Sequence, residues 1–487
     1  MAPEQTRPVN RMSVPDGPAN HDREETPWYI TIDSRRRYAT LTFLRGALVS
    51  LAIAVVAGVL AVMFYIPAVA EALMRPGLSF AVLRPVHTTF ASAWIFLGGI
   101  AVVHRHLQDR GGETGRAERW RLRLQVVLWA VAGGGILLTL VLGISSGREY
   151  MGFHPIFSIA LLTGWLCFAW NFFRVFGRGF WSRPVYVTMW GVGVLFFVFT
   201  FLEQHMYLLP GIFSDPIVDL RIQWKATGTL VGSFNLFVYG SLYYIAEKIS
   251  GDEDYAYSRL AYALFGVGLL NSFTNFAHHT YHLPQGAVIK WISFLVSMTE
   301  ALILIRVIAD IAKSVSRRGS ESFQATKFFL VAAKWWTAAM LASAILLSIP
   351  PLNAFVHGTH AVTGHAMGTE IGIDSMVLFA AVAWLLNEAL ARRGSDVSVL
   401  HSRFIRFSGI GLNVAAALLV TWLHVSGSIV GWWRYQLQPP PDWFLRFNYH
   451  LFAGLGLATA IFLAGLLGVW LRLAFLRSPD TSPARRT

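Results

Sequence analysis

The stretch Val356-His-Gly-Thr-His-Ala-Val-Thr-Gly-His-Ala-Met-Gly-Thr-Glu-Ile-Gly-Ile-Asp374 decides the fold, because it places ionisable residues at the head of an apolar segment. It holds three histidines, one methionine, one glutamate and one aspartate, and the apolar run Ser375–Leu386 follows directly. A helix over 357–390 would span a bilayer, at about 1.5 Å per residue against roughly 30 Å of hydrocarbon. Polar groups inside a spanning helix are costly and usually mark a site, so we expect this helix to carry one.

The composition indicates a polytopic membrane protein. Of the 487 residues, 55% are hydrophobic and 14% are charged, whereas soluble proteins carry about 25% charged residues. The formal charge of +13 does not indicate a nucleic-acid partner, because the basic residues lie in loops on one side of the predicted membrane. The single cysteine, Cys167, excludes an internal disulfide, a cysteine-ligated cluster and a CxxCH heme-attachment site.

Twelve apolar segments predict an all-α membrane protein with a twelve-transmembrane-helix bundle. Basic residues gather in the even-numbered connections and at both ends of the chain, although acids dilute the connection 248–259. The positive-inside rule therefore places both termini in the cytoplasm. The predicted spans are 41–69, 82–104, 123–146, 155–176, 184–208, 224–248, 259–282, 287–312, 326–350, 357–390, 404–431 and 446–474.

Three regions follow from this pattern. Residues 1–40 are polar and lack an apolar core followed by a cleavage site, so they predict a cytoplasmic tail and not a signal peptide. Residues 41–476 form the membrane domain, and residues 477–487 form a second cytoplasmic tail. The longest outer connection, 432–446, contains three consecutive prolines, and we expect it to cap the bundle.

The topology brings histidines of three spans to one depth. His87 lies about one turn below the outer surface in the second span, and His365 lies two to three turns below it in the tenth. His278 and His279 lie near the outer end of the seventh span. These residues therefore converge in the outer half of the membrane.

His87 opens the second span within Arg84-Pro-Val-His-Thr-Thr. A neutral imidazole is a common axial ligand of heme iron, and Arg84 is placed to meet a heme propionate. The alternative is an interfacial histidine that is hydrogen-bonded to a neighbouring backbone carbonyl.

Adjacent histidines point about 100° apart on a regular helix. His278 and His279 can therefore reach one metal ion only if the helix distorts near its end, which Pro284 marks. The alternative is a histidine cluster at the membrane surface.

His365 and Met367 are two residues apart, roughly 200° round a helix, so one helix can hold two irons on opposite faces. The alternative is a packing methionine beside a hydrogen-bonded histidine. For His357 and His360 we favour hydrogen bonds to propionates or backbone over ligation.

The order and spacing of these motifs resemble the catalytic subunit of the heme–copper oxidase superfamily. Within it the chain is most similar to the large subunit of nitric oxide reductase. The resemblance covers nearly all twelve spans. Besides RPVHTT it rests on GREY at 147–150, the histidine pair, SMTEAL around Glu300 and HGTHAVTGHAM from His357.

The resemblance implies a role for each matching residue. His87 matches a ligand of a low-spin heme b, and His365 matches the proximal ligand of a high-spin heme b. Met367 stands where the family has the second histidine of the low-spin heme. His278 and His279 match two ligands of a non-heme metal that faces the high-spin heme.

The sixth span departs from the family pattern. In Asn235-Leu-Phe-Val-Tyr239, the asparagine takes the place of the third metal-ligating histidine, and the span contains no histidine. Tyr239 stands where nitric oxide reductases have a glutamate and many oxidases a tyrosine. An amide oxygen is a harder donor than imidazole and favours iron over copper. The histidine–tyrosine crosslink of oxidases is impossible here.

The resemblance predicts a divergent nitric oxide reductase that converts NO to N₂O. Glu300 would relay protons and Tyr239 would hydrogen-bond an intermediate. A structural calcium is a further expected cofactor. Electrons would come from a membrane-anchored cytochrome c subunit or another donor, in a bacterial inner membrane. We predict no proton pumping, because few acids lie in the inner halves of the spans.

Other functions stay open at this point. One alternative is an oxygen reductase similar to cytochrome c oxidase, or an NO dismutase-like enzyme that forms N₂ and O₂. A second is a non-respiratory heme protein that senses NO or O₂ or acts in transport. A transporter without heme is a third.

Overall fold

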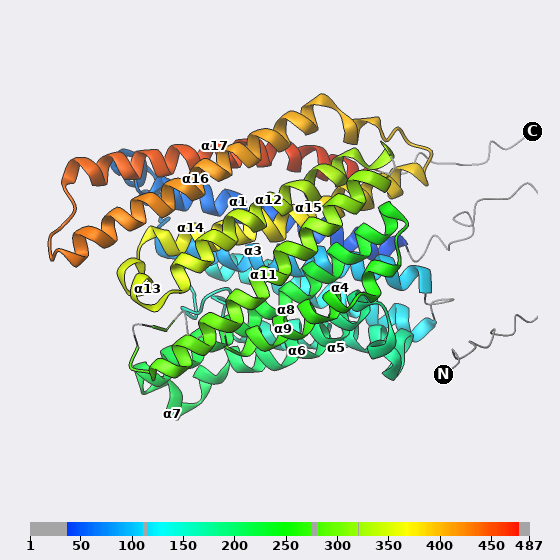
Figure 1. Ribbon diagram of the computed structural model, residues 1–487, viewed down its shortest axis with the longest axis horizontal. Helices are drawn as coiled ribbons and strands as arrows, with labels where there is room; N and C mark the ends of the chain where they lie inside the picture. The colour runs from blue at the N-terminus through cyan, green and yellow to red at the C-terminus, as the bar shows by residue number, and fades with distance from the viewer. Residues whose placement is uncertain (1–36, 111–114, 275–279, 282, 320, 477–487) are drawn as a thin grey trace, which may run out of the picture.

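The protein is described by a computed structural model over residues 37–110, 115–274, 280–281, 283–319 and 321–476. All regular structure in these ranges is helical, which confirms the all-α prediction there. The long helices run side by side along the long axis of the molecule (Figure 1). The predicted tails lie outside these ranges, apart from residues 37–40.

The helices alternate in direction along the bundle. We call the end where α1 begins and α17 ends the terminal end; Arg45 Nε there donates a hydrogen bond of 2.8 Å to the Ala474 carbonyl. The opposite end carries the short helices α7 and α13 (Figure 1), and we call it the far end. The described helices are α1 (Arg37–Met63), α2 (Pro67–Met74), α3 (Phe80–Arg110), α4 (Arg116–Val141), α5 (Ile156–Phe176), α6 (Val185–Gln204), α7 (Pro210–Phe213), α8 (Pro216–Ser250), α9 (Arg259–Thr274), α11 (Ala287–Arg318), α12 (Gln324–Ser348), α13 (Pro350–Val356), α14 (His360–Thr369), α15 (Met376–Ala391), α16 (Arg403–Tyr435) and α17 (Asp442–Phe475).

Short helical turns complete the described secondary structure. Glu370–Ser375 forms a π-helical turn between α14 and α15. The 3₁₀ turns are η1 (Gly177–Ser182), η2 (Met206–Leu208), η3 (Asp254–Tyr257), η4 (Glu321–Phe323) and η6 (Ser398–His401).

Ten described helices are long and apolar enough to cross a membrane. They correspond to ten of the twelve predicted spans. The helices of the two remaining predicted spans, α8 and α9, do not meet this criterion of length and hydropathy in the described residues. The apolar run of α8 is interrupted by polar residues such as Asn235 and Tyr239, and α9 is described only as far as Thr274.

Two predicted boundaries are wrong. The first span ends at Met63 and not at 69, because Pro67 begins the separate helix α2; proline suits a first helical turn, where its missing N–H is not needed. The predicted cap at 432–446 is largely helical, and only residues 436–441 connect α16 to α17. This connection projects from the bundle (Figure 1), and its Leu437 is 94% exposed.

The segment from α14 to α15 forms the centre of the bundle. In its most apolar window 83% of the residues are buried, against 22% for α4 and for α11. A helix that is apolar on all sides belongs in the interior, and the run from Met376 to Leu386 is buried throughout. The stretch that decides the fold therefore also lies at its core.

The helix predicted over 357–390 begins only at His360, and it is interrupted by the π-helical turn at Glu370–Ser375. Gly358 has a φ of +70°, a conformation that glycine adopts readily, and this turn separates His357 from the helix. The Thr359 hydroxyl then caps α14 by accepting a hydrogen bond from the Ala361 N–H. His357 instead offers its backbone carbonyl to Arg434, at 2.8 Å.

Candidate functional site

His87 lies on α3 against α1. Its Nδ1 is 2.8 Å from the carbonyl oxygen of Ala54. That contact assigns the ring proton to Nδ1 and leaves the Nε2 lone pair for a ligand, as is usual for metal-bound histidines. A Cβ at Gly58 would lie 2.7 Å from the same Nδ1, so the glycine makes room for the ring. These contacts fit an axial heme ligand.

Replacing Gly58 by alanine tests this arrangement. The added methyl group would displace the His87 ring. We therefore expect the affinity for the low-spin heme to fall about 10–100-fold, as when a supporting partner of a ligand is lost, and the heme content of the protein to fall with it. The measurement is the low-spin heme absorbance per protein. Gly133→Ala on α4, where the Cβ meets nothing within 4 Å, is the matched control. An unchanged spectrum in Gly58→Ala would show that this contact does not hold a ligand.

His365 on α14 belongs to a hydrogen-bond chain that crosses three helices. The Ser343 hydroxyl on α12 is 3.3 Å from His365 Nδ1 and 2.6 Å from His424 Nε2 on α16. His424 Nδ1 lies 2.8 Å from the Val420 carbonyl, so it carries a proton and its Nε2 accepts from Ser343. The serine oxygen can then accept from His365 Nδ1–H, which leaves the lone pair of His365 Nε2 available to ligate a metal.

Ser343 and His424 were not found from the sequence. Neither belongs to a motif near His365, and only the packing of α12 and α16 against α14 brings them together. A histidine in an apolar span was the one available signal, because ionisable residues there tend to be functional.

Met367 lies in an apolar cluster with Val62, Leu419, Leu423 and Phe452. Val62 lies on α1, four residues after Gly58, so the cluster against which Met367 packs includes a residue of the helix that His87 contacts. A partly buried thioether among apolar groups could serve as a ligand of heme iron.

His360 contacts two aromatic rings and not the hydrogen-bond chain of His365. Its ring centroid lies 5.9 Å from that of Tyr65 and 5.4 Å from that of Phe452. This environment agrees with a supporting group, and its predicted role beside propionates stays a prediction.

Glu300 on α11 faces α9. Its carboxylate accepts a hydrogen bond from the Asn271 amide, whose oxygen accepts one of 2.7 Å from Ser297. Gly268 allows this approach, since a Cβ there would lie 3.0 Å from Glu300 Oε1. Tyr239 on α8 is 7% exposed, and α8 packs against both α9 and α11. The two predicted catalytic residues therefore lie on helices that pack against each other.

Asn235 lies one turn before Tyr239 on α8. Its side-chain oxygen is buried and has no hydrogen-bond partner among the described residues. An orphaned amide oxygen fits a hard donor to iron. His278 and His279 lie outside the described residues, and within the described residues no group of three or more His, Cys, Asp or Glu side chains could hold a metal ion. The second metal site thus stays a prediction.

Arg84 forms an ion pair with Glu149 of the GREY motif, and its side chain is 51% exposed. The neighbouring Arg148 pairs with Asp219 in the first turn of α8, at 2.8 Å. These pairs fix the loop 142–155 at the far end. The predicted contact of Arg84 with a propionate is untested.

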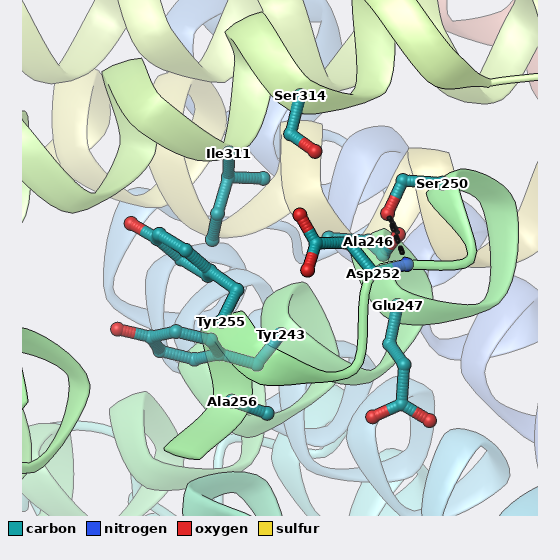
Figure 2. Close-up of a pocket in the computed structure, with 9 residues that line it drawn as sticks. All are labelled: Tyr243, Ala246, Glu247, Ser250, Asp252, Tyr255, Ala256, Ile311 and Ser314. Atoms are coloured by element: carbon teal, nitrogen blue, oxygen red, sulfur yellow. Dashed lines mark hydrogen bonds between the residues drawn. The ribbon is translucent and has the colours of Figure 1, made fainter. Parts of the chain in front are cut away.

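A small cavity lies apart from these residues, between α8, α11 and η3. Figure 2 shows the rings of Tyr243 and Tyr255 side by side at its edge, with centroids 5.7 Å apart. Its volume of about 10 Å³ suits a single water molecule. The hydroxyls of Tyr243 and Ser314 have no partner within the described residues, so they could bind that water.

The fold and these residues define a polytopic membrane protein with histidines on several of its long helices. Residues 39–458 match the sequence profile of cytochrome c and quinol oxidase polypeptide I. The chain therefore belongs to the heme–copper oxidase subunit I family and is a membrane-bound oxidoreductase of that superfamily. Members of this family carry hemes and a binuclear metal centre and take electrons from cytochrome c or quinol.

A solved structure supports the same fold. A heme–copper terminal oxidase dimer, determined by cryo-electron microscopy, aligns with a TM-score of 0.70 and 16% identity over 92% of this chain and 85% of the other. No curated protein sequence matches significantly.

Proposed function

We propose that the chain is the catalytic subunit of a divergent nitric oxide reductase, which reduces NO to N₂O. The observation that carries this proposal is the partly buried Glu300 on α11, whose carboxylate accepts a hydrogen bond from Asn271 and whose helix packs against α8, the helix of Tyr239. A carboxyl group in this place can hold and deliver protons next to the candidate centre. The absence of an imidazole at Asn235 favours a centre with non-heme iron over one with copper.

The proposed cofactors follow the donors described above. His87 and Met367 hold a low-spin heme b, and His365 holds a high-spin heme b. Asn235, with His278 and His279 from outside the described residues, holds the second metal.

The bound hemes and metal supply the electrons and the Lewis-acid positions at which two NO molecules are joined. The protein contributes position and protons. The reaction consumes two electrons and two protons for each N₂O and water formed. Glu300 delivers protons from its bonded position, and the Tyr239 hydroxyl donates a hydrogen bond to an oxygen at the centre.

The cellular setting follows the charge pattern of the sequence. The terminal end faces the cytoplasm of a bacterial inner membrane, and residues 1–40 and 477–487 form tails on either side of the catalytic domain 41–476. Electrons reach the low-spin heme from a membrane-anchored cytochrome c subunit or another donor. A structural calcium is a further component of the proposal.

A product assay on purified protein tests the proposed activity. Reduced enzyme given NO without oxygen should form N₂O, and the preparation should hold about three irons per chain, two in hemes and one outside them. Oxygen uptake, or release of O₂ from NO, would replace this proposal by an oxygen reductase or an NO dismutase-like enzyme. Heme binding without turnover would indicate a sensor or transport protein.

A further inference from the structure

A tyrosine of the loop 142–155 reaches the central helix. The Tyr150 hydroxyl donates a hydrogen bond of 2.7 Å to Glu370 Oε1, which joins the far-end loop to the π-helical turn. Burial, followed by the Glu370 carboxyl, raises the pKa of Tyr150 well above its ordinary value. The hydroxyl therefore keeps its proton and acts as the donor.

Asp374 lies one turn after Glu370 in the π-helical turn. It is 0% exposed, and neither carboxyl oxygen has a partner among the described residues. An ionised carboxylate in this position would be a buried charge without compensation, which is costly. Asp374 takes no part in the proton relay assigned to Glu300 or in the heme ligation assigned to His365.

The π-helical turn is fixed from two sides. On one side Gly372 packs against α12, where a Cβ would lie 2.2 Å from the Trp336 ring. On the other side Trp94 on α3 donates a hydrogen bond of 3.1 Å to the Ser375 hydroxyl. Such turns are rare and frequently occur at functional sites. The packing holds both acids at set positions between the loop and α8.

A metal ion does not explain the two acids. No group of three or more His, Cys, Asp or Glu side chains in the described ranges could hold one. Glu149, the acid beside Tyr150 in the same loop, is paired with Arg84. The remaining ligand that a tyrosine and two carboxyls can bind and release is a proton.

We propose that Tyr150, Glu370 and Asp374 form a proton path from the far end of the bundle to Tyr239. This inference rests on the proposed function, because that function requires protons to be consumed at the centre. Only O–H bonds form and break: a proton enters at the Tyr150–Glu370 pair, passes to Asp374 and leaves toward Tyr239 and Glu300. Each carboxyl returns to its starting state, and no electron moves.

The surroundings give this path an entrance and an end. Glu149 and Arg84 lie at the entrance, and the Glu149 side chain is 22% exposed. Glu370 and Asp374 are one helical turn apart, a separation that a water molecule can bridge. At the other end, α15, which continues the helix after Asp374, packs against α8, the helix that carries Tyr239, and α11 with Glu300 packs against the same helix.

The test uses the full-length protein with both hemes, reconstituted in vesicles. In Asp374→Asn and Glu370→Gln, proton uptake from the far-end side during a single turnover should slow about 100-fold, in line with the loss of a positioned proton carrier. A second readout needs no substrate: Asp374→Asn should remove a carboxylic-acid band from the redox infrared difference spectrum. Asp396→Asn and Glu71→Gln, both at exposed acids, are the matched controls.

The outcomes separate this path from the proposed activity. Proton uptake at the unmodified rate in both variants, or uptake from the terminal end, overturns the path. If the unmodified enzyme does not reduce NO but Asp374→Asn still removes the infrared band, the nitric oxide reductase proposal fails and the path stands. If the acid variants lose heme, Tyr150→Phe decides, since it removes only the hydroxyl that bonds Glu370; normal uptake in that variant overturns the path.

Discussion

His365→Ala is expected to abolish the high-spin heme signal and to lower NO turnover more than about 100-fold. Supporting partners of metal ligands already cost about 10–100-fold when removed, and a direct ligand costs more. The low-spin signal should remain, because His87 is held by α1 through Ala54 and Gly58. Heme content and absorbance of the purified variant give the measurement.

Two comparisons make the His365 result specific. His450→Ala removes an exposed histidine whose ring bonds the Arg446 carbonyl of its own helix, and it should change neither heme. Ser343→Ala should keep the heme but alter its spectrum, because it removes the group that orients His365 Nδ1. Retention of the high-spin heme in His365→Ala would move the ligand to another residue, and the tenth-span assignment would be wrong.

The sequence was sufficient for the apolar helices and for the residues that depart from them. His365 stood out because an ionisable residue in a spanning segment is costly and therefore rare. Its hydrogen-bond chain through Ser343 and His424 was not predictable. Those residues lie on α12 and α16, and no local pattern records which side chains of separate helices meet.

The count of spans shows a limit of hydropathy. The resemblance and the apolar runs indicate twelve spans, whereas ten described helices are apolar enough to qualify. The helix α8 falls short because it carries candidate site residues, Asn235 and Tyr239 among them. The polar groups that make a membrane helix functional are the same ones that weaken its apolar signal.

The π-helical turn at Glu370–Ser375 was also beyond the sequence. A π-helical turn contains one extra residue and shifts the spacing of apolar residues along a helix. In a helix that is apolar on all sides, this shift leaves no visible pattern in the sequence. Close packing of Gly372 against Trp336 became visible only in the structure. The sequence had already marked Glu370 and Asp374 as unusual, but their link to Tyr150 depends on a loop more than 200 residues earlier in the chain.

Met367→His is expected to keep the low-spin heme and to lower its midpoint potential on the order of 100 mV. Methionine ligation raises the potential of a heme relative to histidine ligation, and axial ligands as a group set potentials over about 0.8 V. The imidazole would replace the thioether in the apolar cluster with Val62 and Phe452. A spectroelectrochemical titration of the low-spin band measures the shift.

Two further variants decide whether Met367 is a ligand. Met367→Leu keeps the apolar volume but removes the sulfur, so it should convert the low-spin signal to a high-spin one while the high-spin heme on His365 stays unchanged. Met74→His places an imidazole on the exposed α2, where the methionine is 56% exposed, and should leave the potential as it is. A low-spin spectrum and potential that survive unchanged in Met367→Leu would rule out the methionine and make His360, about two helix turns nearer the far end, the next candidate.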